Sequence, residues 1–225
     1  YRIMIENISP KYEPFVKHVH VETPGTLDRL IPRNERDRIT KLVITGYLNS
    51  KDFDDVLDDM CRIEYDYEYE GDPDDEDDYK VDWSETPRLR TLDMGDCELV
   101  GQSILPTFGY KSVLENLVLP QKVENTMDSD YDCAFDGYSL KTLVLPEGLK
   151  VFSGFGCNDN LKDVVIPDSV EEIGEYALSH CISLESINIP PKAQLYGNPF
   201  QGCTSLVRFD LHPDNPYYTL VDGVL

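Results

Sequence analysis

The sequence predicts a solenoid, a β-rich α/β right-handed superhelix in which short strands stack into a parallel sheet on one face. This prediction rests on a frame that recurs along the chain and on the alternation of aliphatic residues inside each copy. The frame reads leucine, two variable residues, an aliphatic residue, one variable residue, a second aliphatic residue and often proline. Copies of the frame begin at Ile39, Leu89, Leu114, Leu140, Leu161, Leu184 and Leu206.

The spacing of the copies identifies the type of repeat. From Leu89 onward they follow one another at 25, 26, 21, 23 and 22 residues, which is the period of leucine-rich repeats, about 20–29 residues. The step from Ile39 to Leu89 is 50 residues, which leaves room for an insertion. A single short strand cannot bury its aliphatic row alone, so successive copies must stack into one continuous core. The sequence therefore predicts a leucine-rich-repeat solenoid.

Each strand is expected to point alternate side chains into the coil. In the copy that starts at Leu140, Leu143 and Leu145 point inward, whereas Val144 points outward. Pro146 follows and ends the strand, because proline has no N–H group for the ladder. The sheet face is therefore built from the residues between the aliphatic positions.

The far side of each coil is predicted to hold short strands and short helical turns. In the clearest copy, Val170 and Ile173 form a second inward pair, and Gly174 suits a bend that needs a positive φ. Residues 176–178 form a helical turn that makes Leu178 a plug at the far end of the coil. The residues expected to play the same part in other coils are Phe135, Phe152, Phe155 and Phe200.

Two segments of the C-terminal half resemble a known repeat family. Residues 167–184, which read PDSVEEIGEYALSHCISL, are similar to the repeat of the BspA-type leucine-rich-repeat family, and residues 199–206 match the same phrase. Residues 214–225 also resemble that family. The resemblance covers residues 112–225 well and residues 39–111 loosely. It implies a surface or secreted protein of Bacteroides-type bacteria, with adhesion to host matrix proteins as the expected role.

The chain divides into four expected regions. They are a tail or the end of a preceding module (residues 1–14), an N-terminal cap with the first repeat (15–62), an acidic insertion loop (63–84) and the repeat solenoid (85–225). Thr26 is expected to cap a short helix, and Ser50 a second helix over residues 51–61 with apolar side chains at helical spacing. A terminal unit of this kind shields the open edge of the first coil.

Acidic residues dominate the charge of the chain, which is −23 at pH 7. Residues 64–82 carry eleven acidic side chains and one lysine, a charge of −10 that leaves −13 for the rest. So acidic a surface repels phosphate backbones and anionic lipid, which argues against nucleic-acid partners and direct membrane insertion. No run approaches the roughly 20 apolar residues that span a bilayer, and no signal peptide opens this chain. An extracellular or cell-surface location is therefore expected from the family resemblance alone.

Part of the insertion loop is similar to a calcium-binding loop. The candidate ligands are Asp66, Glu68, Glu70, Asp72 and Asp77. Gly71 occupies the sixth position, as it does in such loops. However, glutamate is long for the third and fifth positions, and Asp77 is short for the twelfth. A solvated acidic loop without a metal is the favoured interpretation, and weak calcium binding is the alternative.

The six cysteines are interpreted as small buried thiols of the repeats. Cys181 and Cys203 each lie three residues before the first leucine of a copy, so neighbouring coils could bring them together as a disulfide in an exported protein. The sequence contains no known catalytic motif, phosphate loop or dinucleotide fingerprint. Neither enzymatic activity nor a cofactor is therefore expected.

The outward positions of the strands form the candidate binding surface, because consecutive strands stack at about 4.8 Å. They comprise an apolar stripe of Val118, Val144 and Val165, with Asn116, Thr142, Asp163 and Asn188 as polar neighbours. Stacked valines can simply favour sheet formation. Alternatively, the stripe is a contact site, since exposed apolar patches with polar rims mark interaction sites.

The favoured function is an extracellular or cell-surface binding and adhesion module that presents its repeat surface to a macromolecular partner. The alternative is a glycan-binding component of a surface nutrient-uptake system. The partner is accordingly expected to be a protein or a glycan, and the sequence does not identify which one.

Overall fold

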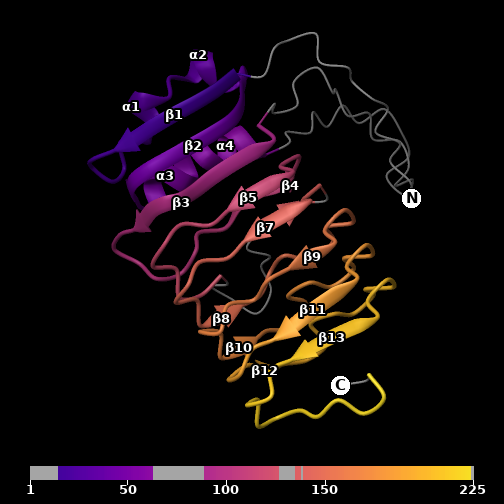
Figure 1. Ribbon diagram of the computed structural model, residues 1–225. Coiled ribbons are helices and arrows are strands. Elements are labelled where there is room, and N and C mark those ends of the chain that lie inside the picture. Colours follow the sequence, from indigo (N-terminus) through magenta and orange to yellow (C-terminus); the bar gives the residue numbers. More distant parts are fainter. Residues whose placement is uncertain (1–14, 63–88, 127–134, 138, 224–225) are drawn as a thin grey trace, which may run out of the picture.

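The computed structural model describes residues 15–62, 89–126, 135–137 and 139–223. Its repeats stack along one direction, so that strands from successive copies run parallel (Figure 1). The first strands are β1 (Phe15–Val21), β2 (Ile39–Leu48), β3 (Thr91–Leu99), β4 (Phe108–Ser112), β5 (Asn116–Val118), β6 (Phe135–Gly137) and β7 (Thr142–Val144). The later ones are β8 (Val151–Phe152), β9 (Asp163–Val164), β10 (Glu172–Ile173), β11 (Ser186–Ile189), β12 (Gln194–Leu195) and β13 (Arg208–Leu211).

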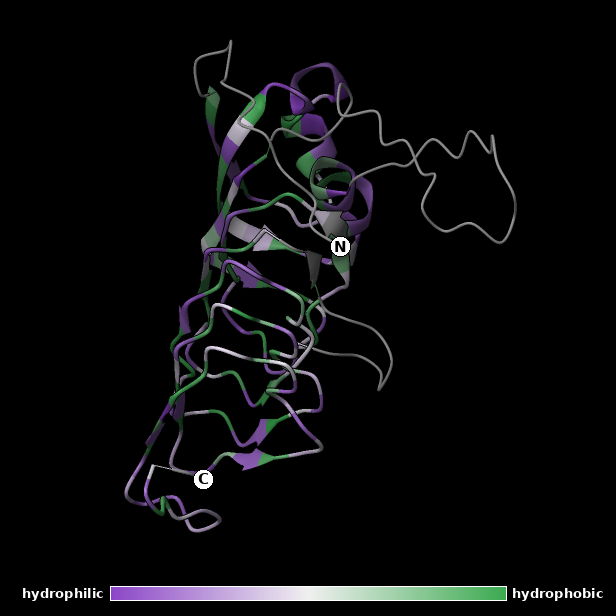
Figure 2. Cartoon of the chain, turned by 90° about the vertical axis from the view of Figure 1, so that its right-hand side faces the viewer, coloured by the Kyte–Doolittle hydropathy of each residue, from purple (hydrophilic) through white to green (hydrophobic). Residues whose placement is uncertain are grey.

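The strands form two walls around the core. One wall, which we call the front sheet, contains five strands in the order β1-β2-β3-β5-β7, and it is continued next to β7 by three strands in the order β9-β11-β13. The back sheet, β8-β10-β12, lies on the opposite side of the coils (Figure 2). Strands β4 and β6 form a further pair. The parallel sheets confirm the predicted repeat fold.

The alternation predicted for the front sheet is confirmed. Leu92, Leu117 and Leu143 are neighbours in the register and are buried. Val144 is 51% exposed, whereas Leu143 and Leu145 on either side of it are 6% and 8% exposed. The inward leucines therefore build the core, and the residues between them form the outer face.

A column of phenylalanine rings fills the core behind the front sheet. Ring centroids are 5.4 Å apart for Phe53 and Phe108, 5.5 Å for Phe108 and Phe135, and 6.2 Å for Phe135 and Phe155. Phe152 extends the column at 5.8 Å from Phe155. Because Phe53, Phe108, Phe135 and Phe155 come from successive coils, the column links the N-terminal part of the core to the middle of the stack. It also confirms the expected plugs at Phe135, Phe152 and Phe155, and Phe200 packs against the core as a partly buried ring.

The far side of the clearest coil differs from the prediction at one glycine. Val170 and Ile173 are fully buried, as predicted. Gly174, however, is not among the residues with positive φ; in this turn the positive φ falls on Tyr176, at 60°. A Cβ atom added at Gly174 would lie 3.0 Å from the Cβ of Ser153 in the preceding coil. Close approach between coils, rather than a bend, therefore favours glycine at this position.

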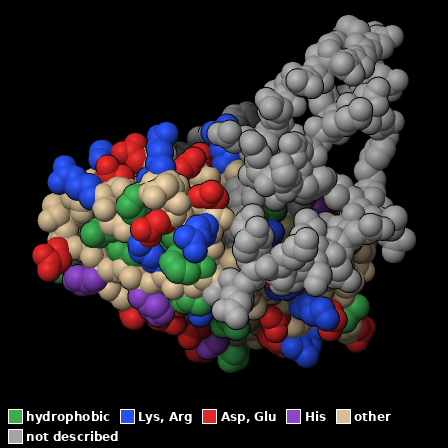
Figure 3. Space-filling model, turned by 90° about the horizontal axis from the view of Figure 1, so that it is seen from above, with side chains coloured by type: hydrophobic (Ala, Val, Ile, Leu, Met, Phe, Trp, Pro, Cys, Tyr) green, Lys and Arg blue, Asp and Glu red, His purple; other side chains and the backbone are tan. Residues whose placement is uncertain are grey.

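The N-terminal unit, residues 15–62, places helical segments beside β1 and β2. Two short helices, α1 (Leu27–Leu30) and α2 (Arg33–Arg36), connect these strands. A continuous helical segment follows β2 and comprises α3 (Ser50–Asp52), the π-turn η1 (Phe53–Leu57) and α4 (Asp58–Cys61). Viewed from above, acidic and basic side chains are intermixed over this end of the molecule (Figure 3). Strand β2 pairs directly with β3, so the first two copies of the frame are neighbours although 50 residues separate them in the sequence.

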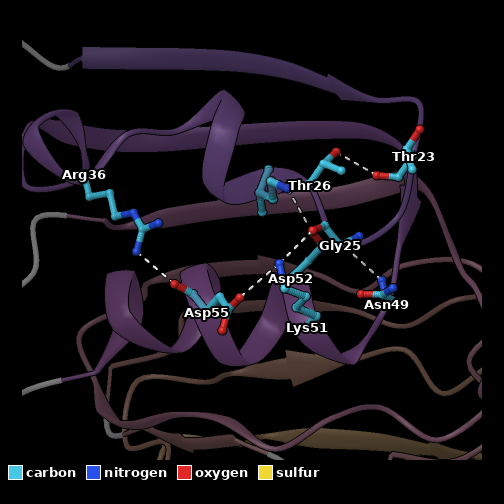
Figure 4. A network of polar contacts seen from close by, with 9 residues as sticks. Thr23, Gly25, Thr26, Arg36, Asn49, Lys51, Asp52 and Asp55 are labelled. Carbon is cyan, nitrogen blue, oxygen red and sulfur yellow. Dashed lines mark hydrogen bonds and ion pairs between the residues drawn. The ribbon is translucent and has the colours of Figure 1, made fainter.

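Thr26 is the N-cap residue of α1, as predicted, but its side chain makes no capping hydrogen bond, and the prediction that Ser50 caps the second helix is wrong. The Thr26 hydroxyl donates to the carbonyl of Thr23 at 2.7 Å instead of capping α1. Ser50 is the first helical residue, and Asn49 precedes it as the N-cap. Instead, the buried carboxylate of Asp52 accepts hydrogen bonds from backbone N–H groups at the starts of both helices. Figure 4 shows this network. Asp52 accepts hydrogen bonds from the backbone N–H groups of Gly25, Leu27 and Asn49 at 2.7, 3.0 and 3.0 Å.

Candidate functional site

The valine stripe, defined as Val118, Val144 and Val165, lies on the outer face of the front sheet. Val118 and Val144 are direct partners in the register of β5 and β7. Val165 follows β9, which lies next to β7. Val144 and Val165 are 51% and 78% exposed, and Val118 is half-buried. The structure therefore brings the three valines to one face and leaves two of them open to solvent.

The polar row beside the stripe is joined by its own hydrogen bonds. The Asn116 amide donates to the Thr91 hydroxyl at 3.2 Å, and the Thr142 hydroxyl donates to Asn116 Oδ1 at 2.8 Å. These bonds run between strands that are neighbours in the register. Asn116 and Thr142 thus stabilise the sheet with part of their hydrogen-bonding capacity. Asp163 is exposed at the next position along this row.

Asn188 has a structural task that the sequence analysis missed. Its Nδ2 donates to the carbonyl of Ile166 at 2.7 Å, and its Oδ1 accepts from the N–H of Ile166 at 2.8 Å. Strand β9 ends at Val164, so the amide of Asn188 supplies the pairing that a longer strand would have supplied from its backbone. Asn188 therefore lies at the C-terminal side of the valine stripe, and its two hydrogen bonds to the backbone of Ile166 join β11 to the residues that follow β9.

The outer face of the front sheet continues from β5 toward the N-terminus across β3, β2 and β1. Asp93 pairs with Val118 on one side and with Val43 on the other, and Val43 pairs in turn with His18. A second contact across these strands joins His20 Nδ1 and the Thr45 hydroxyl at 2.8 Å. The frame that starts at Ile39 was the available signal, because it places Val43 at an outward position.

A charged hollow lies between α1, α2 and the helical segment that follows β2. Its lining residues are Asp28, Arg33, Arg36, Asp54, Asp55, Asp58, Asp59 and Arg62. Arg36 is bonded to Asp59 at 2.7 Å and to the carbonyl of Asp55 at 2.9 Å, and Arg62 pairs with Asp58 at 3.5 Å. Because acidic and basic groups form ion pairs within the hollow, we interpret it as a structural contact between helices.

The thiols of successive coils form a column that is poorly suited to nucleophilic chemistry. Cys181 Sγ donates to the carbonyl of Phe155 at 3.6 Å, and Cys203 Sγ donates to that of Leu178 at 3.0 Å. Burial raises the pKa of Cys181 to about 12 and also raises the pKa of Cys203. Both are free thiols in the structure. At neutral pH they are protonated, and the thiolate is the reactive form.

Within residues 15–62, 89–126, 135–137 and 139–223, no group of three or more His, Cys, Asp or Glu side chains could hold a metal ion. The calcium candidates Asp66, Glu68, Glu70, Asp72 and Asp77 lie outside these residues. Every helix that the structure describes is too short or too polar to cross a bilayer.

Comparison with known proteins agrees with the repeat seen in the structure. The model of the BspA type leucine rich repeat region matches residues 105–217 in six copies. No curated protein matches the chain. The matched residues span half of the chain and contain the strands from β4 to β13. The resemblance found in the sequence is thereby confirmed, and the chain belongs to the BspA-type leucine-rich-repeat family.

Proposed function

We propose that the protein is an adhesion module of the cell surface or extracellular space that binds another protein through the outer face of its front sheet. Leucine-rich-repeat domains generally mediate protein interactions, which supports binding as the task of this chain. The valine stripe is the observation that favours the outer face of the front sheet as the binding surface. Val144 and Val165 expose apolar side chains side by side on a sheet face with polar neighbours, and such patches mark interaction sites.

The rest of the chain holds this binding surface in place. The stack is a right-handed superhelix, and residues 15–62 are its N-terminal cap, whose helical segment packs Phe53 onto the phenylalanine column of the core. The protein acts by binding and without catalysis. Support comes from the protonated thiols described above and from the two ion pairs within the hollow, Arg36–Asp59 and Arg62–Asp58.

Binding by the purified chain to a panel of purified matrix proteins, measured by surface plasmon resonance beside a glycan array, tests this proposal. The informative variant is Val165→Glu, and its matched control is Val207→Glu. The two valines are 78% and 81% exposed, but Val207 lies outside the stripe. The few residues that dominate an interface each cost more than about 1 kcal/mol when they are replaced. If Val165 is one of them, Val165→Glu should weaken binding about tenfold.

The control variant should bind as the native chain does, and both variants should keep the native melting temperature within a few degrees. The proposal fails if the chain binds none of the matrix proteins. It also fails if the two valine variants lose affinity equally, because the stripe would then have no special part in binding.

A further inference from the structure

The back sheet carries a groove on the side opposite the valine stripe. In the register of β8, β10 and β12, Glu172 is the partner of both Val151 and Gln194. These three side chains are half-buried, whereas Phe152 and Ile173 beside them are fully buried. The row Val151–Glu172–Gln194 therefore faces outward. It forms the floor of a groove of about 680 Å³, a size typical of small-ligand sites.

The walls of this groove come from two places in the chain. Lys150 and Glu171 form one rim as an ion pair of 3.1 Å. Tyr196 lines the groove after β12, and the chain folds back so that Asp214 and Tyr217 line it as well. Tyr196 and Tyr217 are 44% and 54% exposed. Two tyrosine rings thus remain open to solvent within one groove, although an aromatic ring is among the largest apolar groups a fold can bury.

The wall that carries Tyr217 is held in place by hydrogen bonds. The Asn215 amide donates to the carbonyls of Pro190 and Ala193 at 2.7 and 2.9 Å. The N–H of Leu195 donates to the Tyr218 hydroxyl at 2.7 Å, which fastens this segment to β12. Tyr217 lies between these two anchors, and its own N–H donates to Asn215 Oδ1 at 2.9 Å. The backbone that carries the exposed ring is therefore held in place, which reduces the entropy lost when a ligand stacks on the ring.

The polar groups of the groove are available to a ligand. Among the described residues, no hydrogen bond or ion pair engages the carboxylate of Glu172, which is half-buried on the floor. The Gln194 amide has one long contact, 3.4 Å, to the Tyr196 hydroxyl. A carboxylate offers two acceptor oxygens and an amide offers both donors and an acceptor. Such groups suit a ligand with adjacent hydroxyl groups.

The charges of the groove indicate a neutral ligand. Lys150 and Lys192 are opposed by Glu171, Glu172 and Asp214, so the lining carries a small net negative charge. An anionic ligand would meet the unpaired carboxylate of Glu172. The floor spans three strands that are about 4.8 Å apart, or roughly 10 Å in all, which suits a short chain rather than a single ring. Val151 is the only aliphatic residue of the floor, so an apolar peptide side chain would find little surface to bury.

We propose that this groove binds a neutral oligosaccharide. Sugar rings stack their C–H faces on Tyr196 and Tyr217, and sugar hydroxyls donate to Glu172 and exchange hydrogen bonds with Gln194. The site lies on the back sheet and is independent of the protein-binding surface proposed for the front sheet.

Titration calorimetry of the full chain with cellohexaose, laminarihexaose, xylohexaose and maltohexaose tests the groove. At least one hexaose should bind with a Kd below about 1 mM. Tyr217→Ala should weaken that binding at least tenfold, and Gln194→Ala should weaken it as well. Tyr47→Ala is the matched control, because Tyr47 is 44% exposed, as Tyr196 is, but lies on β2 of the front sheet. The control should bind as the native chain does.

A melting curve for each variant shows whether it is folded, and Tyr196→Ala provides a second probe if Tyr217→Ala is not. Failure of all four hexaoses to bind overturns the proposal. So does binding that both tyrosine variants leave unchanged. Binding of a member of a peptide library that Tyr217→Ala abolishes, with no sugar bound, assigns the groove to peptides and equally overturns it.

Discussion

Replacement of Asp52 with alanine is expected to destabilise the protein by about 2–5 kcal/mol. The carboxylate is 1% exposed and accepts three backbone hydrogen bonds, from Gly25, Leu27 and Asn49. The bond to Leu27 is buried, so its N–H would lose its acceptor at a cost of about 1–3 kcal/mol. The other two bonds are part-buried, and water replaces the carboxylate there at about 0.5–1 kcal/mol each. For a chain of this size the melting temperature should fall by at least about 4 °C.

The matched control is Asp54→Ala, a change to an exposed aspartate in the same helical segment. It should alter the free energy of unfolding by less than about 0.5 kcal/mol. Asp52→Asn should fall between the two, because the amide keeps one acceptor oxygen but turns a donor toward backbone N–H groups.

Urea denaturation measures the free energies, and hydrogen exchange at the amides of Gly25, Leu27 and Asn49 reports the local effect. A loss below about 1 kcal/mol for Asp52→Ala, or unchanged exchange at these amides, would refute the role assigned to Asp52.

Other regions give further predictions. Val144→Glu should cost about 1 kcal/mol or less, whereas Leu143→Ala should cost about 2–5 kcal/mol; equal melting temperatures would mean that the strand faces are assigned wrongly. Asn188→Ala should cost about 1–3 kcal/mol in urea denaturation, because the backbone of Ile166 loses both bonds to the amide, and a neutral result would contradict that role. Burial raises the pKa of Cys97 and Cys181 to about 12, so native protein at pH 8 should resist iodoacetamide at both thiols until it unfolds. Since the folded state keeps these protons longer than the unfolded state does, stability should fall as the pH rises above about 9; a flat profile from pH 9 to 11 would oppose this account.

The strands and their faces could be predicted because they depend on neighbours in the chain. Leu143, Val144 and Leu145 alternate in a strand whatever the rest of the fold does, and the register then aligns Val144 with Val118. The period of the frame predicted the stacking of coils, since each coil needs a neighbour to bury its aliphatic row. The candidate stripe followed from the same alternation.

The sequence by itself therefore determined the strands of the front sheet from β2 onward, which of their side chains face the core, and that the copies stack. Only the tertiary structure decided which polar group satisfies a given backbone atom. Thr26 and Ser50 have the local pattern of caps, yet Asp52 binds N–H groups up to 27 residues away because packing brings the loop at Gly25 against the helix. Asn188 bonds to Ile166 for the same reason, and the groove under Tyr217 exists because residues 214–218 fold back on β12. Such contacts depend on the relative placement of coils, which no local pattern specifies.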